Sequence, residues 1–182
     1  MPSFYHPFPF QKGLLNFDGD EFHHLINVSR HKSGDTVKLN NGMGDLALAK
    51  IESVNKKYAQ LDILEIQSFS KGSPEIAIAF ALLKNKNDLW IIEKLTEIGV
   101  KHFFPMETRF SIRRIIDKKN KENDPIVDKM SKVAVAAIKQ CDNAFLPTIH
   151  PVNSLENTLS LIKSQNFLPI IASEQEKNTT LL

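Results

Sequence analysis

The pattern of hydrophobic and polar positions divides the chain into two parts, which are predicted to contain different secondary structure. In the first part they alternate over three stretches, as in strands with one buried face: Thr36 to Leu39, Asp45 to Ile51 and Tyr58 to Ile66. Asn41-Gly42, between the first two stretches, predicts a hairpin turn because both residues tolerate positive φ. Ahead of them, Asp18 to Arg30 has apolar residues at helical spacing, which predicts a short amphipathic helix. Several short strands around one helix predict a small barrel or a curled sheet.

A polar stretch from Ser68 to Pro74 marks the boundary, and strands then alternate with helices. The continuous apolar run from Ile76 to Leu83 predicts a parallel strand that is buried on both faces. A helix is expected from Asn87 to Ile98, followed by a strand from Val100 to Phe104 that Pro105 closes. These three elements predict a βαβ unit with a right-handed crossover.

The rest of the chain predicts two more helices and one more strand. Asp124-Pro125 opens a long helix, since proline suits the first helical position. Its apolar residues fall on one face: Ile126, Met130, Val133, Ala134, Ala137, Ile138 and Cys141. Ser154 is expected to cap a shorter helix that runs to Ile162, and Phe167 to Ala172 is expected to form a strand. The second part is therefore predicted to be α/β.

Composition narrows the class of protein without naming an activity. Of the 182 residues, 42% are hydrophobic and 24% are charged, as in globular proteins, and the net charge is only +2. Cys141 is the single cysteine, which rules out an internal disulfide and favours a reducing compartment. The start of the chain does not resemble a signal peptide, and the longest apolar run is far below the ~20 residues that span a bilayer. We therefore expect a cytoplasmic protein.

Several familiar catalytic and metal-binding patterns are absent or have simpler explanations. His23 and His24 are adjacent, and neighbours on a helix rarely bind one metal ion, so no metal site is expected. Gly42-Met43-Gly44 follows a strand but opens no helix, which favours a turn over a phosphate loop. Cys141 lies on an apolar helix face and is expected to be structural. Glu93 and Glu97 form a carboxylate pair or, equally well, a salt-bridged surface with nearby lysines.

Basic residues gather in three clusters, and these are the most informative polar feature. The clusters are Arg30, His31 and Lys32; Lys84 and Lys86; and Arg109, Arg113, Arg114, Lys118, Lys119 and Lys121. Solvated loops explain each cluster alone about as well as contacts with a polyanion do. Three clusters, spread over both parts of the chain, favour phosphate contacts modestly, because affinity for RNA increases when several cations of one surface contact its phosphates. Residue spacing alone leads no further than an α/β protein with RNA affinity.

Four stretches in order resemble the family of small-subunit ribosomal RNA methyltransferase E, the uridine-N3 methyltransferases of the SPOUT superfamily. They are FHHLINVSRHKSGDTVKL (22–39), ALLKNKNDLWIIEKLTEIGVKHFFP (81–105), MSKVAVAAIKQCDNAFLP (130–147) and FLPIIASE (167–174). The resemblance implies an N-terminal PUA-like β-barrel that holds RNA, at residues 1–70. It also implies an α/β domain with a trefoil knot, at residues 74–182. S-adenosylmethionine as methyl donor, a homodimer and a ribosomal RNA substrate are implied with them.

The same resemblance suggests roles for individual residues. Arg30 matches an arginine that holds RNA, and Lys84 falls in a loop where the family has basic residues. Glu97 and Gln140 match residues that support the active site. The loop after the last strand is expected to approach the cofactor, through Ala172, Ser173 and Glu174.

Departures from the family pattern leave more than one function open. The family often has Thr-Glu-Arg-Ser after the second strand, whereas this chain has Glu107-Thr108-Arg109-Phe110-Ser111. Many members have Gly-Arg where Asp142-Asn143 stand. The Gly-Pro-Glu-Gly-Gly cofactor loop does not occur in these 182 residues, so we expect a chain that is truncated before the cofactor loops. The alternatives are a methyltransferase, a non-catalytic RNA-binding fragment, and an unrelated nucleotide-binding α/β enzyme.

Overall fold

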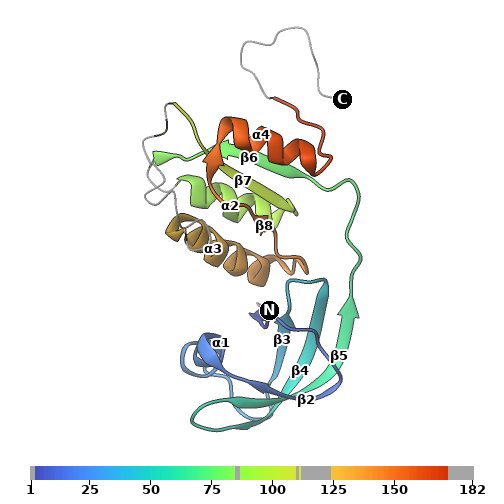
Figure 1. The fold of residues 1–182 in the computed structure, drawn as a ribbon. Coiled ribbons are helices and arrows are strands. Elements are labelled where there is room, and N and C mark those ends of the chain that lie inside the picture. The colour runs from blue at the N-terminus through green and yellow to red at the C-terminus, as the bar shows by residue number, and fades with distance from the viewer. Residues whose placement is uncertain (1–2, 85–86, 110, 112–123, 172–182) are drawn as a thin grey trace.

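The computed structural model describes residues 3–84, 87–109, 111 and 124–171. It contains two sheets, one in the N-terminal part and one in the α/β part, that lie one above the other (Figure 1). Residues 69–76 run between them without helix or strand.

The N-terminal sheet has five strands in the order β1-β3-β4-β5-β2. Their bounds are β1 Ser3–Tyr5, β2 Gly13–Phe17, β3 Thr36–Asn40, β4 Asp45–Val54 and β5 Ala59–Ser68. The predicted strands correspond to β3, β4 and β5, and the Asn41-Gly42 turn joins β3 to β4 as expected. β1 and β2 form the two edges, and the described residues show no pairing between them, so this PUA-like sheet is open rather than a closed barrel.

The predicted helix of this part is present and packs against the sheet. It begins as α1 (Gly19–His23) and continues as the π-helical turn η1 (His24–Val28). Leu25 is fully buried in the core that the sheet and helix share, with Phe22 packed beside it. The amphipathic spacing therefore predicted correctly which face of the helix is buried.

The second part is a parallel sheet with helices on both of its faces (Figure 1). Its strands are β6 (Ala77–Ala81), β7 (His102–Glu107), β8 (Thr148–Ile149) and β9 (Asn153–Ser154). Its helices are α2 (Asn87–Glu97), α3 (Pro125–Cys141) and α4 (Leu155–Ser164). α2 and α3 cover one face and α4 the other, and Met130, Ala134 and Phe103 lie in the core.

Strand β7 corrects the prediction that Pro105 closes a strand, because Pro105 lies inside it. A proline has no N–H to donate to a neighbouring strand. β8 pairs with His102 and Phe103, and β9 pairs with Met106 and Glu107. Pro105 falls in the gap between β8 and β9, so no hydrogen bond is lost.

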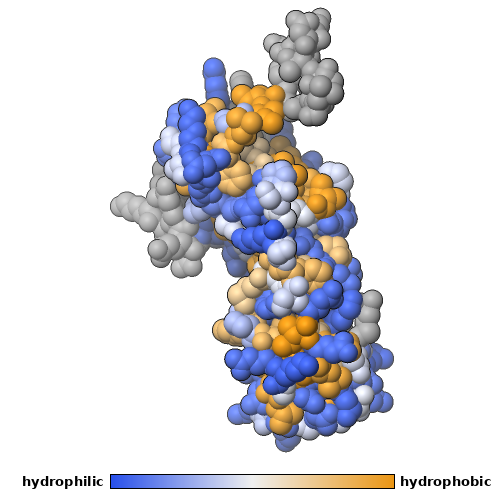
Figure 2. Space-filling view, turned by 90° about the vertical axis from the view of Figure 1, so that its right-hand side faces the viewer, coloured by the Kyte–Doolittle hydropathy of each residue, from blue (hydrophilic) through white to orange (hydrophobic). Residues whose placement is uncertain are grey.

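Three further expectations for the α/β part are wrong. The described residues 167–171 form no strand, and Leu168, Ile170 and Ile171 are 83%, 66% and 85% exposed. Figure 2 shows the corresponding hydrophobic surface at the upper end of the molecule. β6 is not buried on both faces: of its residues only Phe80 is buried. Cys141 is exposed; it is the last residue of α3, and Asp142 after it has the left-handed conformation.

Candidate nucleic-acid interface

Lys84 and Arg109 lie at the same edge of the α/β sheet. In the ladder between β6 and β7, Ala81 is opposite Met106, and the two cations follow these residues by the same number of positions. Leu82 N donates to Met106 O (3.0 Å), which extends the pairing toward this edge. The carboxyl ends of parallel strands are where α/β sheets bind ligands, so the two exposed cations lie where an anionic ligand would approach.

A tight turn after β7 carries Arg109. Ser111 is 6% exposed, and its hydroxyl accepts a hydrogen bond from Thr108 N (3.0 Å). Ser111 N donates in turn to Thr108 O (3.1 Å), and the two hydroxyls are 3.1 Å apart. These hydroxyls hold the turn, and the turn presents the exposed Arg109 at its tip.

In the N-terminal part, Arg30 and Lys32 follow the helix in a loop of fixed shape. Arg30 is exposed and has φ of 58°, a left-handed conformation that is uncommon for a residue with a side chain. The Asp35 carboxylate accepts hydrogen bonds from Lys32 N (2.8 Å) and His31 Nδ1 (3.3 Å). The bond from Lys32 N, more than the neighbouring His31, lowers the pKa of Asp35. The loop is therefore fixed by its backbone, and its long cationic side chains extend into solvent.

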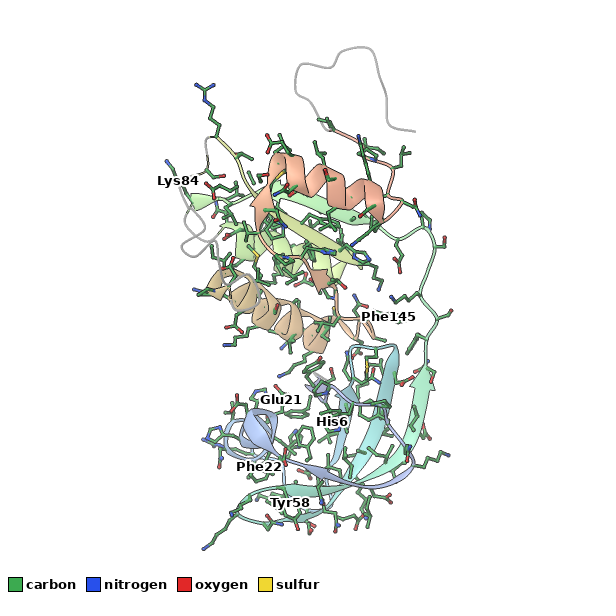
Figure 3. All side chains as sticks on the ribbon, in the orientation of Figure 1. His6, Glu21, Phe22, Tyr58, Lys84 and Phe145 are labelled. Atoms are coloured by element: carbon green, nitrogen blue, oxygen red, sulfur yellow. The ribbon has the colours of Figure 1, made fainter. Side chains whose placement is uncertain are left out.

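Lys84 and the helix that precedes Arg30 can be located in Figure 3. In Figure 3, Lys84 and the helix that leads to Arg30 are both on the left of the view, and the segment 69–76 is on the right.

The other predicted site residues divide into two groups. Lys86, Arg113, Arg114, Ala172, Ser173 and Glu174 lie outside the described residues. Glu97 and Gln140 are at the carboxyl ends of α2 and α3, away from the edge that carries Lys84. Lys94 Nζ is 2.9 Å from Glu97 Oε1 and 2.8 Å from Glu93 Oε1, and these bonds, the one to Glu93 first, raise the pKa of Lys94. The salt-bridged surface is thus the interpretation of this carboxylate pair that the geometry favours.

Sequence analysis missed a cluster of histidines and phenylalanines under α4. His102 Nδ1 lies 3.3 Å from His150 Nε2, and the His150 ring stacks on Phe104 with 4.0 Å between centroids. Glu75 Oε2 is 3.4 Å from His102 Nε2. Burial, together with the neighbouring His102, lowers the pKa of His150. Among the described residues no group of three or more His, Cys, Asp or Glu side chains could hold a metal ion.

Sequence analysis also missed the contact between the two parts, in which the buried Asn40 and the half-buried Asn143 take part. Asn40 Nδ2 donates to Asn143 O (3.0 Å), and Asn143 Nδ2 donates to Thr96 O (3.0 Å). Asn40 was available as a signal, since it precedes a hairpin turn and ends an apolar strand. Nothing in local spacing connects it to a residue 103 positions away.

Family models match both parts of the chain in order. A model described as an RNA methyltransferase domain matches residues 71–182, and one described as an RNA methyltransferase PUA domain matches residues 17–64. Within the described residues, no helix is long and apolar enough to cross a membrane.

Individual proteins that are similar to the chain agree with these models. Ribosomal RNA small subunit methyltransferase E of Bacillus subtilis (strain 168) is 28% identical over 165 residues, which cover 90% of this chain and 62% of the relative. The crystal structure of the Neisseria gonorrhoeae protein of that name, bound to S-adenosyl methionine, has a TM-score of 0.76 at 21% identity, over 87% of this chain and 65% of that one. A Legionella pneumophila structure in complex with the cofactor SAM has a TM-score of 0.73 at 27% identity, over 83% and 62%. The chain thus spans about three fifths of the length of these proteins.

Proposed function

Because the chain belongs to the RNA methyltransferase family, we propose that it transfers a methyl group from S-adenosylmethionine to small-subunit ribosomal RNA. The observation that carries this proposal is the match of two domain models, one for methyl transfer and one for RNA binding, in the order in which the two sheets follow each other. The similar Bacillus subtilis protein is named for the same reaction.

The finer parts of the proposal follow the family resemblance. We place the RNA-binding domain at residues 1–70 and the methyltransferase domain at 74–182, with N3 of a uridine in 16S RNA as the methylated atom. The whole enzyme would be a cytoplasmic homodimer whose methyltransferase domain contains a trefoil knot. Residues 172–174 would approach the cofactor.

The described residues contribute by holding the RNA. Arg30 and Lys32 contact phosphates from the N-terminal sheet, and Lys84 and Arg109 do so at the edge where the reaction takes place. S-adenosylmethionine, when bound, supplies an electrophilic methyl group on a sulfonium. Uracil N3 carries a proton in neutral uridine, so the base must lose that proton as the new N–C bond forms. Cations held close to the base would favour the anion that results.

Methyl transfer and RNA affinity are measured separately to test the proposal. Purified chain is incubated with labelled S-adenosylmethionine and 16S RNA, and label in the RNA is the expected result. Replacing Lys84 and Arg109 by alanine should weaken RNA binding. The slope of the logarithm of the RNA association constant against the logarithm of salt concentration should become less steep by about 1 for each lost phosphate contact. Lys163→Ala, an exposed lysine on α4, is the matched control and should leave the slope unchanged.

A second candidate is RNA binding without methyl transfer, because the cations in both parts can contact RNA phosphates without any catalytic step. Calorimetric titration with S-adenosylmethionine separates the two. Cofactor binding supports the methyltransferase. Salt-dependent RNA binding by a folded chain that takes up no cofactor and transfers no label would support the second candidate and overturn the first.

A further inference from the structure

The turn between β3 and β4 pairs with the α/β part through its backbone. Gly44 N donates to Ala144 O (2.9 Å), and Leu146 N donates to Gly42 O (2.8 Å). The residues between them pair as in antiparallel strands. We call residues 40–44 and 143–146 the interdomain joint. The turn that sequence analysis took for a simple hairpin is thus also a contact between the parts.

Two asparagines fix the conformation of this turn from within. Asn40 and Asn41 are 0% and 1% exposed. Asn40 Oδ1 accepts a hydrogen bond from Gly42 N (2.8 Å), and Asn41 Oδ1 accepts bonds from Met43 N (2.8 Å) and Asp45 N (3.0 Å). Buried amide groups that are bonded in this way hold one backbone geometry, since any other would leave them unpaired.

The joint continues into the helix that leads back to the cationic edge. Asn40 contacts Asn143, and the Asn143 side chain in turn donates to Thr96 O, in the last turn of α2. The first residue of α2 is Asn87, three positions after Lys84. A rigid helix therefore connects the joint with the segment that carries this cation.

No side chain fits at either glycine of the joint. A Cβ on Gly42 would lie 2.9 Å from Leu146 Cβ and 3.1 Å from Tyr5 Cε2, and one on Gly44 would lie 2.9 Å from Phe145 Cε1. Both glycines have positive φ, +69° and +116°. The two parts approach this closely because both positions lack a side chain.

Two ion pairs join the parts in addition to the joint. Lys38 Nζ is 2.6 Å from Asp142 Oδ2, and Lys139 Nζ is 2.7 Å from Glu21 Oε1. The second pair is the better shielded, with side chains 12% and 25% exposed. The backbone pairing and the two ion pairs together constrain both the distance and the angle between the parts.

We propose that the interdomain joint holds the RNA-binding sheet at a fixed distance from the methyl-transfer edge, and that Gly42 and Gly44 are positioning residues for the reaction. This inference rests on the proposed function. An RNA bound by Arg30 and Lys32 is then presented to Lys84 and Arg109 at high effective concentration. Such linkage raises affinity without any additional contact.

The chain offers a matched control for each glycine. Gly19 has φ of +72° and Gly13 has φ of +109°, close to the values at Gly42 and Gly44, and a Cβ at either control position meets nothing within 4 Å. Gly42→Ala is therefore compared with Gly19→Ala, and Gly44→Ala with Gly13→Ala. Each pair shares the cost of the strained backbone, and only the joint variant adds a clash between the parts.

Two measurements are made on the full chain. Spin labels at Lys57→Cys and Lys163→Cys, both exposed and in different parts, report the interdomain distance by pulsed electron paramagnetic resonance in a Cys141→Ser background. Titration with a 16S RNA fragment at several salt concentrations reports affinity. Thermal melting confirms that each variant is folded.

The expected result is a narrow distance distribution for the wild type and both controls, and a broad one for Gly42→Ala and Gly44→Ala. RNA affinity of the two joint variants should fall by about tenfold, with a shallower salt slope, because fewer cations engage one RNA at once. Equal distributions in the joint and control variants, or a broad distribution with wild-type affinity, would overturn the joint's role. Wild-type protein that binds no RNA would overturn the proposed function and the positioning role with it, while the distance data would still show whether the joint is rigid.

Discussion

At the scale of single residues, burial makes two histidines sensitive to acid. His6 and His150 are half-buried, and burial, more than any neighbouring charge, lowers the pKa of each. A histidine with a lowered pKa in the folded state binds fewer protons there than in the unfolded chain, over the pH range below about 6.5. Folding stability should therefore be complete above that range and fall as the pH drops through it.

The variant His150→Gln tests the predicted loss of folding stability at low pH. The wild type should lose free energy of unfolding between pH 7.5 and pH 5.5, and the variant should lose less, because it has no imidazole to charge beside His102. Urea unfolding at the two pH values gives the difference. His23→Gln, at an exposed position on α1, is the control substitution. A variant at position 150 that behaves like the control would contradict the assignment.

Single residues also show where the sequence was informative. Asn41-Gly42 predicted a turn, because local backbone preference decides turns. The contact of that turn with residues 144–146 was not predictable, since it depends on shape across a large sequence separation. The exposure of Cys141 was missed because the apolar face of the sequence pattern extends to the last residue of α3, whereas in the structure that residue is exposed.

At the scale of elements, the cap of α3 gives a quantitative prediction. The Asp124 side chain accepts a hydrogen bond from Ile126 N (2.8 Å), and Pro125 occupies the first helical position. Asp124→Ala should lower the free energy of unfolding by about 1 kcal/mol. Asp128→Ala on the same helix removes only an exposed ion pair with Lys132 and should cost less than about 0.5 kcal/mol. Equal losses in urea unfolding would show that the cap bond is not formed.

Elements with strong local periodicity were predicted well. α3 and α2 were located from apolar spacing and capping residues, and β3, β4 and β5 from alternation. Strand β1 was missed because it has only three residues, and the partners of both β1 and β2 are distant in the sequence. The apolar run at 167–171 shows the opposite error, since hydrophobicity alone does not create a strand without a neighbour to pair with.

At the scale of the whole molecule, the ion pair between Lys139 and Glu21 joins α3 to the N-terminal helix. Glu21 Oε2 also accepts a hydrogen bond from Tyr5 N (2.9 Å), so removing the lysine leaves a partly buried carboxylate without its counter-charge. Lys139→Ala should lower the free energy of unfolding by about 1–2 kcal/mol. Lys132→Ala on the same helix, whose ion pair is 76% and 63% exposed, should have little effect. Similar urea midpoints for the two variants would refute the prediction.

The order of the two parts and the class of each were predictable from the sequence, and the relation between the parts was not. Texture changes at residues 68–74, and the resemblance over four stretches implied the fold of each part. The positions of Lys84 and Arg109 at one edge follow from strand register, which the spacing of the chain implied only loosely. The interdomain joint could not be predicted, because its central hydrogen bonds join backbone groups and Asn40 alone does not indicate a partner 103 positions away.

The joint also has a consequence for modularity. Its central hydrogen bonds run between peptide groups, so that part of the joint depends on the shape of the backbone. A sheet from another protein could be grafted in place of the N-terminal one if its hairpin ended in two glycines of the same conformation. Chimeras of this kind would also need side chains that replace Asn40, Lys38 and Glu21 as partners of residues 143, 142 and 139.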